Sequence, residues 1–312
     1  VHDDAAAHYL QERLVSNVLE RCCGGGGGGG GGDGANSESS GSFGSFGSFG
    51  SFGSGQMRPT ALSLEQFETD TQRVLDEYCA GLVREKDLLG DARAWPNYLT
   101  DYKPLVQAAV AAGCPVIAAN APRRYVSAVG RNGAGCLQQM QQQQVKCTDA
   151  SEAAAAAVQE ARWKFNAEDW LPPLDGACEA SPGYVAKFQS VMGAVGIKPS
   201  PEEPRGAAAA ATGGKQPASS GSRSCPYIGF TKAGTHMLQA QTLWDSTMAW
   251  KLFSWWRTAD AATAAAHLRH GEGGRQSLPP LVLHVCGKFH CEGGLGIPEH
   301  LHRYQREAEA AP

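Results

Sequence analysis

The residues best suited to chemistry follow an apolar run near the end of the chain. The run Leu281-Val282-Leu283-His284-Val285-Cys286 stops at Gly287, and Lys288-Phe289-His290 come directly after it. A glycine-opened turn at the carboxyl end of a buried strand is where open α/β sheets place their ligand-binding groups. The pattern therefore predicts that His290 stands at the edge of a sheet, as a metal ligand or a proton carrier.

Three more polar residues occupy comparable places. The apolar stretch 60–64 ends on Glu65, the stretch 115–119 ends on Asn120, and His2 leads into a helix. Each has an ordinary structural interpretation as well, with Glu65 facing solvent or a cation and Asn120 supplying a turn conformation. Because parallel strands bring their carboxyl ends together, we nevertheless expect the four residues to form one site.

Two kinds of chemistry fit these residues. His2, Glu65 and His290 would hold a divalent metal that activates water, so that Glu65, Asn120, Arg124 and His290 become candidate catalytic residues of a hydrolase. The same cleft would alternatively accept a flat apolar ligand such as haem, whose iron takes His, Tyr or Met ligands. The side chains expected to line the cleft are Tyr125, Met237, Trp244 and Met248, although a Met and Trp stripe of this kind more often belongs to an ordinary apolar core. The sequence leaves both chemistries open.

Strand-like and helix-like segments alternate along the chain, which predicts an α/β fold with a largely parallel sheet flanked by helices. Helices are expected over residues 5–20, between Leu64 and Leu82, between Pro104 and Gly113, after Pro122, over residues 236–256 and from Pro298. A small helical cap is expected from about 171–198 and 234–257. Low-complexity inserts of Gly/Ser-Phe-Gly, Gln/Ala and Pro/Ala/Ser composition are expected at about 23–57, 138–161 and 199–224.

Composition excludes several classes of protein. The chain of 312 residues has a net charge of −4 and no cluster of basic residues, so nothing favours a nucleic-acid partner. No apolar run reaches the ~20 residues that a spanning helix needs, so no transmembrane segment is expected. The ten cysteines show no paired C-x-x-C spacing, which favours free thiols in a reducing compartment.

Four motifs together resemble the ChaN-like haem-binding uptake domain of the Tiki superfamily. They are the segments 62–70 (LSLEQFETD), 118–126 (AANAPRRYV), 241–249 (QTLWDSTMA) and 287–290 (GKFH). They occur in the order of the family, and the resemblance covers nearly everything outside the inserts as one domain.

The resemblance implies a haem- or iron-handling binding protein, with its ligand near the strand ends and the helical cap. The residues expected to contact the cofactor are Arg123, Arg124, Tyr125, Gln241, Asp245, Met248 and His290, the two arginines as partners for propionates or simply for surface acids. The superfamily also contains metal-dependent peptidases with a glycine-x-x-histidine signature, here Gly287 to His290. A metal-dependent hydrolase that uses His2, Glu65 and His290 therefore remains the alternative function.

Further expectations follow from the same resemblance. The family's opening glycine-glutamate-x-histidine motif survives only as Val1-His2-Asp3, which predicts a chain truncated at its N-terminus. The expanded inserts suggest a eukaryotic, algal homologue and, by analogy with plant relatives, a plastid location. Because haem binding in related proteins can need two subunits, a homodimer is one expected assembly.

Overall fold

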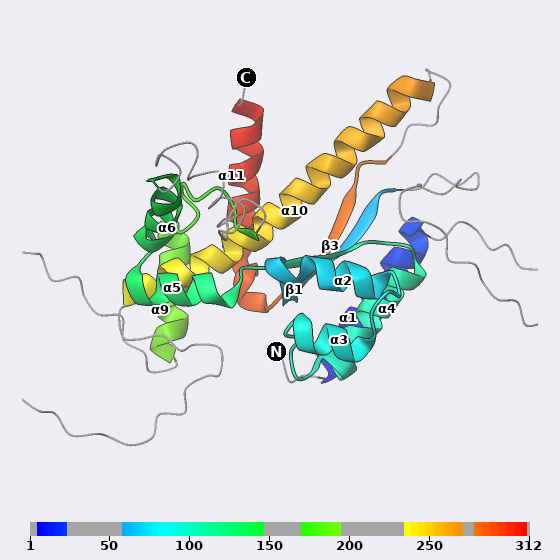
Figure 1. The fold of residues 1–312 in the computed structure, drawn as a ribbon, viewed down its shortest axis with the longest axis horizontal. Coiled ribbons are helices and arrows are strands. Elements are labelled where there is room, and N and C mark those ends of the chain that lie inside the picture. Colours follow the sequence, from blue (N-terminus) through cyan, green and yellow to red (C-terminus); the bar gives the residue numbers. More distant parts are fainter. Residues whose placement is uncertain (1–4, 24–57, 147–169, 195–233, 271–277, 311–312) are drawn as a thin grey trace, which may run out of the picture. The chain divides into compact units, whose positions relative to one another are not determined.

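The computed structural model describes residues 5–23, 58–146, 170–194, 234–270 and 278–310, which form an α/β fold around an open sheet of three parallel strands (Figure 1). The strands are β1 (Thr60–Glu68), β2 (Val116–Asn120) and β3 (Leu281–Val285), in the order β2-β1-β3. The predicted α/β class with a parallel sheet is therefore confirmed. The helices are α1 (Ala5–Cys23), α2 (Gln72–Cys79), α3 (Glu85–Asp91), α4 (Lys103–Ala111), α5 (Arg123–Asn132), α6 (Gly135–Lys146), α9 (Pro182–Ala194), α10 (Gly234–His270) and α11 (Ile297–Ala310).

The central strand β1 is longer than the sequence predicts. It pairs with β3 in parallel register from Thr60 opposite Leu281 to Leu64 opposite Val285, and all nine of its residues are buried. The expectation that the strand ends on Glu65 is wrong, because the strand continues to Glu68. A central strand is covered on both of its faces. The polar residues at its carboxyl end can therefore be buried, although a sequence of this kind suggests that they face solvent.

The chain divides into two compact units that are each assembled from several separate stretches. Unit 1 comprises residues 1–67, 71–118 and 252–285, and unit 2 comprises residues 68–70, 119–251 and 286–312. The helix α10 begins in unit 2 and ends in unit 1.

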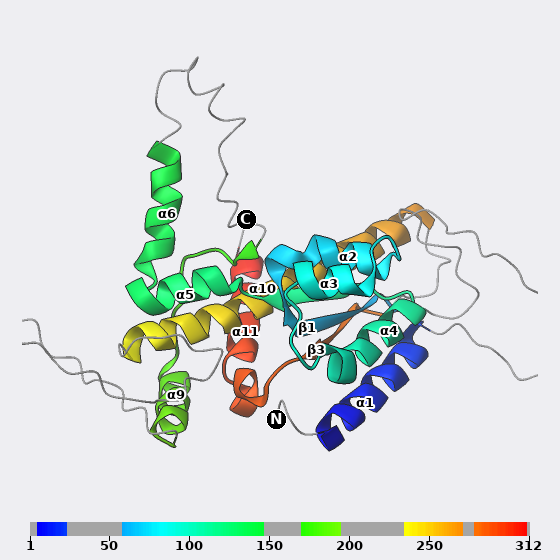
Figure 2. The ribbon, with the colours of Figure 1, turned by 60° about the horizontal axis from the view of Figure 1, so that its bottom comes forward.

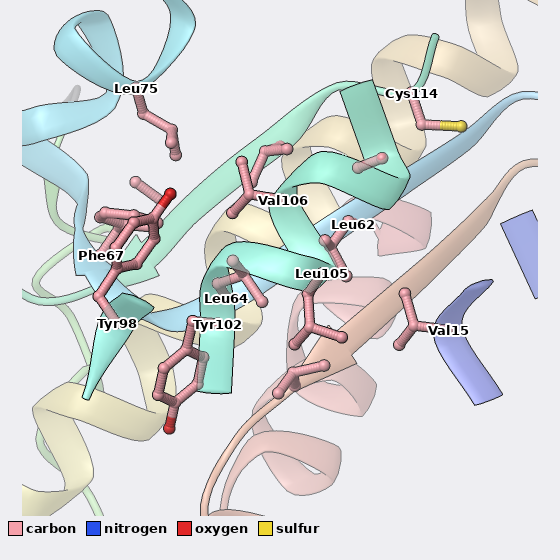
Figure 3. Packing of buried hydrophobic residues seen from close by; sticks show 14 of the residues in the cluster. Val15, Leu62, Leu64, Phe67, Leu75, Tyr98, Tyr102, Leu105, Val106 and Cys114 are labelled. Atoms are coloured by element: carbon pink, nitrogen blue, oxygen red, sulfur yellow. The ribbon is translucent and has the colours of Figure 1, made fainter. Parts of the chain in front are cut away.

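The core of unit 1 is formed by strand residues and by the helices that cover them. Figure 3 shows Leu62 and Leu64 of β1 facing Leu105 and Val106 of α4, and all four are fully buried. Pro104 stands in the first turn of α4, and Gly113 takes a positive φ of 67° just beyond its end. Both boundaries of this helix agree with the prediction.

Helix α1 packs against α4, as Figure 2 shows, through a narrower face than its sequence suggests. Val15 and Leu19 are buried with exposed fractions of 4% and 1%, whereas Leu10 and Leu14 are 66% and 65% exposed. Leu10 and Leu14 belong to an apolar repeat of four-residue spacing in the sequence, yet both lie on the exposed side of the helix. A helix of this length buries one stripe only, and the stripe that contacts α4 starts one residue later.

Unit 2 has its own apolar core around α5 and α10. Tyr125, Val126 and Val129 of α5 pack with Ala240 and Leu243 of α10. Helix α5 begins directly after Pro122, as predicted, and Pro298 occupies the second position of α11.

The predicted inserts and cap are only partly covered by the structure. In the predicted Gln/Ala-rich insert, the residues up to Lys146 belong to α6. The other two predicted inserts lie outside the described residues, except for Cys23, which is the last residue of α1. The expected cap helices are α9 and α10, the latter extending to His270. In the part of the chain that the structure describes, no helix is long and apolar enough to cross a membrane.

Candidate functional site

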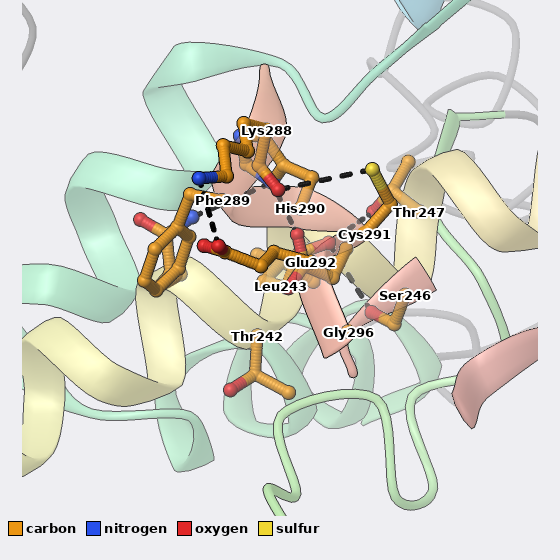
Figure 4. A network of polar contacts seen from close by, with 12 residues as sticks. Thr242, Leu243, Ser246, Thr247, Lys288, Phe289, His290, Cys291, Glu292 and Gly296 are labelled. Atoms are coloured by element: carbon orange, nitrogen blue, oxygen red, sulfur yellow. Dashed lines mark hydrogen bonds and ion pairs between the residues drawn. The ribbon is translucent and has the colours of Figure 1, made fainter. Parts of the chain in front are cut away.

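His290 lies in a tight turn that starts two residues after β3. Gly287 precedes a 3-10 turn, Lys288–His290, and the backbone N–H of His290 donates to the carbonyl oxygen of Gly287 at 3.0 Å. The imidazole is only 11% exposed, and Figure 4 shows it directed toward α10. The glycine turn thus places the histidine in the interior of unit 2.

The imidazole binds a carboxylate on α10. Nδ1 of His290 is hydrogen-bonded to Oδ1 of Asp245, whose side chain has no solvent exposure. Gln241, one helical turn earlier, places its Nε2 3.5 Å from the same ring nitrogen. A carboxylate at Nδ1 fixes the ring orientation and favours the tautomer with its lone pair on Nε2, the arrangement found in histidines that bind metals. Gln241 and Asp245 therefore lie on the same side of α10, as their four-residue spacing requires.

Helix α9 contributes a tyrosine and a lysine to this region. The helix begins after Ser181, whose hydroxyl accepts the backbone N–H of Tyr184 at 3.1 Å, and Pro182 occupies its first position. Lys187, one turn further, donates to the carbonyl oxygens of Phe289 at 2.7 Å and Glu292 at 3.4 Å. Its ammonium also lies 4.7 Å from the centre of the Phe289 ring. The lysine therefore holds the turn that carries His290.

Tyr184, Lys187, Gln241, Asp245 and His290 form what we call the His290 cluster, in which burial shifts two pKa values. Burial raises the pKa of Asp245, and the nearby His290, Tyr184 and Lys187 oppose that rise. Burial also raises the pKa of Tyr184, and the negative charge of Asp245 adds to the effect. The Tyr184 hydroxyl and the Asp245 Oδ2 atom are buried without a hydrogen bond of ordinary geometry to any described residue. Such atoms usually have a water or ligand partner, because leaving them unsatisfied costs about 1–3 kcal/mol each.

Gly296 closes the cluster on one side. Its φ is +81°, and a Cβ at this position would lie 2.6 Å from both the Asp245 Oδ2 atom and the His290 carbonyl oxygen. Any larger residue would therefore be strained in its backbone and would collide with the hydrogen-bonded pair. The glycine allows the chain after His290 to pass directly over the carboxylate.

Arg123 and Arg124 are paired with two acids at the end of β1, namely Glu68, its last residue, and Asp70, two residues further on. Arg123 binds the buried carboxylate of Glu68 through its side chain and also through its backbone N–H at 3.1 Å. Arg124 binds Asp70, and its guanidinium lies 4.5 Å from the ring centre of Tyr125 and 5.0 Å from that of Trp170. These arginines were expected to bind either haem propionates or acidic residues of the protein. In the structure both pair with acidic residues. The Arg124 side chain remains 44% exposed.

The other predicted site residues are distributed over both units. Asn120 is the last residue of β2, and its side-chain oxygen is buried without a hydrogen bond to a described residue. Met248 is fully buried, whereas Glu65 is buried in β1 within unit 1. His2 lies outside the described residues. Metal binding by His2, Glu65 and His290 therefore stays a prediction, and the described segments contain no group of three or more His, Cys, Asp or Glu residues placed to hold a metal ion.

Sequence reasoning missed three residues of this region, namely Tyr184, Lys187 and Gly296. Ser181-Pro182 signals the start of a helix, and Tyr184 and Lys187 stand three residues apart on one face of it. Nothing in the sequence shows that this face meets the turn at His290, since the two segments are about a hundred residues apart. Gly296 belongs to a glycine-rich stretch in which no single glycine is distinguished.

Comparison with known proteins identifies the family of the chain. No curated protein matches the chain, and no solved structure does. A family model described as "Haem-binding uptake, Tiki superfamily, ChaN" matches residues 51–301, which include the whole His290 cluster and both arginines. The chain therefore belongs to the ChaN haem-binding uptake family of the Tiki superfamily.

Proposed function

We propose that this protein binds haem through the His290 cluster of unit 2, with His290 as the iron ligand. The observation that carries the proposal is the family match over residues 51–301. The cluster supports it, because an imidazole whose Nδ1 is bonded to a carboxylate presents Nε2 as a strong donor to iron.

The residues present fit such a group in their chemistry. Two buried polar atoms beside the imidazole, the Tyr184 hydroxyl and Asp245 Oδ2, have no ordinary hydrogen bond among the described residues. A bound ligand or an ordered water would satisfy them. When bound, haem would supply the iron centre that the protein carries.

The protein residues have distinct roles in this proposal. Asp245 and Gln241 orient the imidazole, and Lys187 fixes the turn by binding two of its carbonyl oxygens. Arg124, exposed and stacked on Tyr125 and Trp170, offers a cation for a ligand carboxylate in addition to its bond to Asp70. Arg123 is held more firmly, since it binds Glu68 through both backbone and side chain.

The test is a visible-absorbance titration of the purified chain with ferric haem. The wild type should give a saturable, shifted Soret band. His290→Gln should weaken binding by at least about tenfold, equivalent to ~1.4 kcal/mol. Glutamine is chosen because an alanine would leave the buried Asp245 carboxylate without its partner, at a cost of about 3–5 kcal/mol in stability.

Three further variants separate the roles of the residues. Asp245→Asn should keep saturable binding but shift the band or its pH profile, because the carboxylate acts through the imidazole. Tyr125→Phe should retain the wild-type band if His290 is the ligand. His302→Gln changes an exposed histidine of α11 and should leave the titration unchanged.

An unshifted, non-saturating spectrum of the wild-type chain would refute haem binding. An equal loss in His302→Gln and His290→Gln would refute the assignment of His290 while leaving the family function in place. Far-UV circular dichroism of each variant shows whether the fold is retained.

A further inference from the structure

Two cysteines that are far apart in the sequence meet within unit 1. Cys23 is the last residue of α1, and Cys114 stands immediately before Pro115 and β2. Their Sγ atoms are 2.7 Å apart, although 91 positions separate the residues. A disulfide bond has a length of ~2.05 Å, so the sulfur atoms need to approach by only about 0.7 Å to become bonded.

The surroundings hold both cysteines in place. Cys114 belongs to the apolar core of unit 1 with an exposed fraction of 6%, and Cys23 packs against the same core. The backbone N–H of Cys114 donates to the carbonyl oxygen of Ala109 at 2.8 Å, which fixes the turn after α4. Val15 and Leu19 hold α1 on the same core, as Figure 3 shows for Val15 and Cys114. The core of unit 1 thus holds the two thiols next to each other.

Only one of the two thiols is readily accessible. Cys23 is half-buried, whereas Cys114 is buried and its pKa is raised by desolvation and by the neighbouring Cys23. Cys79, a half-buried thiol of unit 1, has a pKa raised to about 11, mainly by burial. Among the described cysteines, Cys23 and Cys114 have their sulfur atoms in contact.

We propose that Cys23 and Cys114 form a reversible disulfide that ties the end of α1 to the start of β2. The oxidant is a small-molecule disulfide such as oxidised glutathione. The Cys23 thiolate attacks one sulfur of the oxidant, forms a mixed disulfide and releases the first small thiol. Cys114 then attacks the Cys23 sulfur, and its proton passes to the second departing thiolate. Two protein thiols are oxidised by two electrons in all, and one small disulfide is reduced to two thiols.

The experiment equilibrates the full chain in buffers of varied ratio of reduced to oxidised glutathione. Free thiols are then blocked with iodoacetamide, and the protein is digested without reductant for mass spectrometry. The expected product is a peptide pair linked through Cys23 and Cys114, two hydrogens lighter than the sum of its parts and lost on reduction. The urea midpoint of unfolding should rise on oxidation and return on reduction.

Variants identify the bond and control for folding. Cys22→Ser and Cys79→Ser should retain the linked pair and the midpoint shift, while Cys23→Ala and Cys114→Ala should abolish both. Cys23→Ala alters a half-buried position, so it keeps the test valid if Cys114→Ala fails to fold. A persistent glutathione adduct on Cys23 with Cys114 still free to alkylate would overturn the proposal. A wild-type bond from Cys114 to Cys22 would overturn it equally.

Discussion

At the scale of single residues, the hydrogen-bonded pair of His290 and Asp245 is the centre of the proposed haem site. The carboxylate is completely buried, and its hydrogen bond to the imidazole, together with Tyr184 and Lys187, favours its charged form against the cost of burial. In the proposed haem site the carboxylate in turn fixes which ring nitrogen faces the iron. The two residues therefore act as one group, and replacing either changes both stability and ligand chemistry.

A second histidine, His300, makes the stability of the protein sensitive to acid. Burial and the nearby Arg303 lower its pKa from 6.5 to about 4. The unfolded chain thus binds this proton more readily than the folded chain, and stability falls as the pH drops from about 6.5 toward 4. Between pH 7 and about 4.5 this histidine should account for a loss of about 2–3 kcal/mol.

Urea unfolding of the wild type and of His300→Gln at several pH values measures that contribution. The variant should lose less stability on acidification, by roughly the amount given above. His302→Gln, at an exposed position of the same helix, should retain the wild-type pH dependence. Parallel curves for the wild type and His300→Gln would contradict the assignment.

At the scale of elements, α1 shows how a strong sequence pattern can identify the helix and still miss its buried face. Leu10, Leu14, Val15 and Leu19 all fit an amphipathic helix, and the helix is present. Which of the leucines is buried depends on where α4 lies, and that is a tertiary contact with no local signal.

Two matched variants test this face. Leu19→Ala should destabilise the protein by about 2–4 kcal/mol, because it leaves a cavity in the core of unit 1. Leu14→Ala removes the same atoms from an exposed position and should change the stability by less than about 0.5 kcal/mol. Chemical denaturation followed by circular dichroism distinguishes them, and equal effects would show that the burial of α1 has been misassigned.

The same distinction explains how much of the fold and the candidate site is predictable from the sequence. The strands, the helices after Pro104 and Pro122, and the turn that presents His290 were predictable because local signals mark their boundaries. The extension of β1 to Glu68 was not, because burial of its polar end depends on the neighbouring strands and on Arg123. Tyr184, Lys187 and Gly296 join the site through contacts between distant segments, which spacing cannot reveal.

At the scale of the whole molecule, the two units are interleaved along the chain. Unit 2 needs residues 286–312 as well as 119–251, since the Tyr304 hydroxyl donates to the carbonyl oxygen of Ser246 at 3.1 Å and His290 binds Asp245. The Trp250 and Tyr304 rings also lie 5.1 Å apart. The apolar core around α5 and α10 lies within residues 119–251, and the C-terminal stretch completes the packing beside it, around Ser246 and Trp250 of α10.

A fragment of residues 119–251 should therefore lack cooperative unfolding. It would lose Tyr304 and His290 and expose the apolar surface that they cover. A fragment of residues 119–312 restores both and should recover a cooperative transition in urea, followed by tryptophan fluorescence. Cooperative unfolding of the shorter fragment would show that the C-terminal stretch is dispensable for the core of unit 2.

The interleaving also limits how the gene can be rearranged. A single recombination breakpoint between homologous genes exchanges everything on one side of it, so it cannot transfer either unit intact. From residue 119 onward, unit 2 comprises residues 119–251 and 286–312, with a stretch of unit 1 between them. Exchanging unit 2 alone over this part of the chain therefore needs breakpoints near residues 251 and 285 as well as one near residue 119. If the single crossover falls between residues 245 and 290, the chimera takes Asp245 from one parent and His290 from the other. The hydrogen bond between them is then kept only if both parents have the same two residues at these positions.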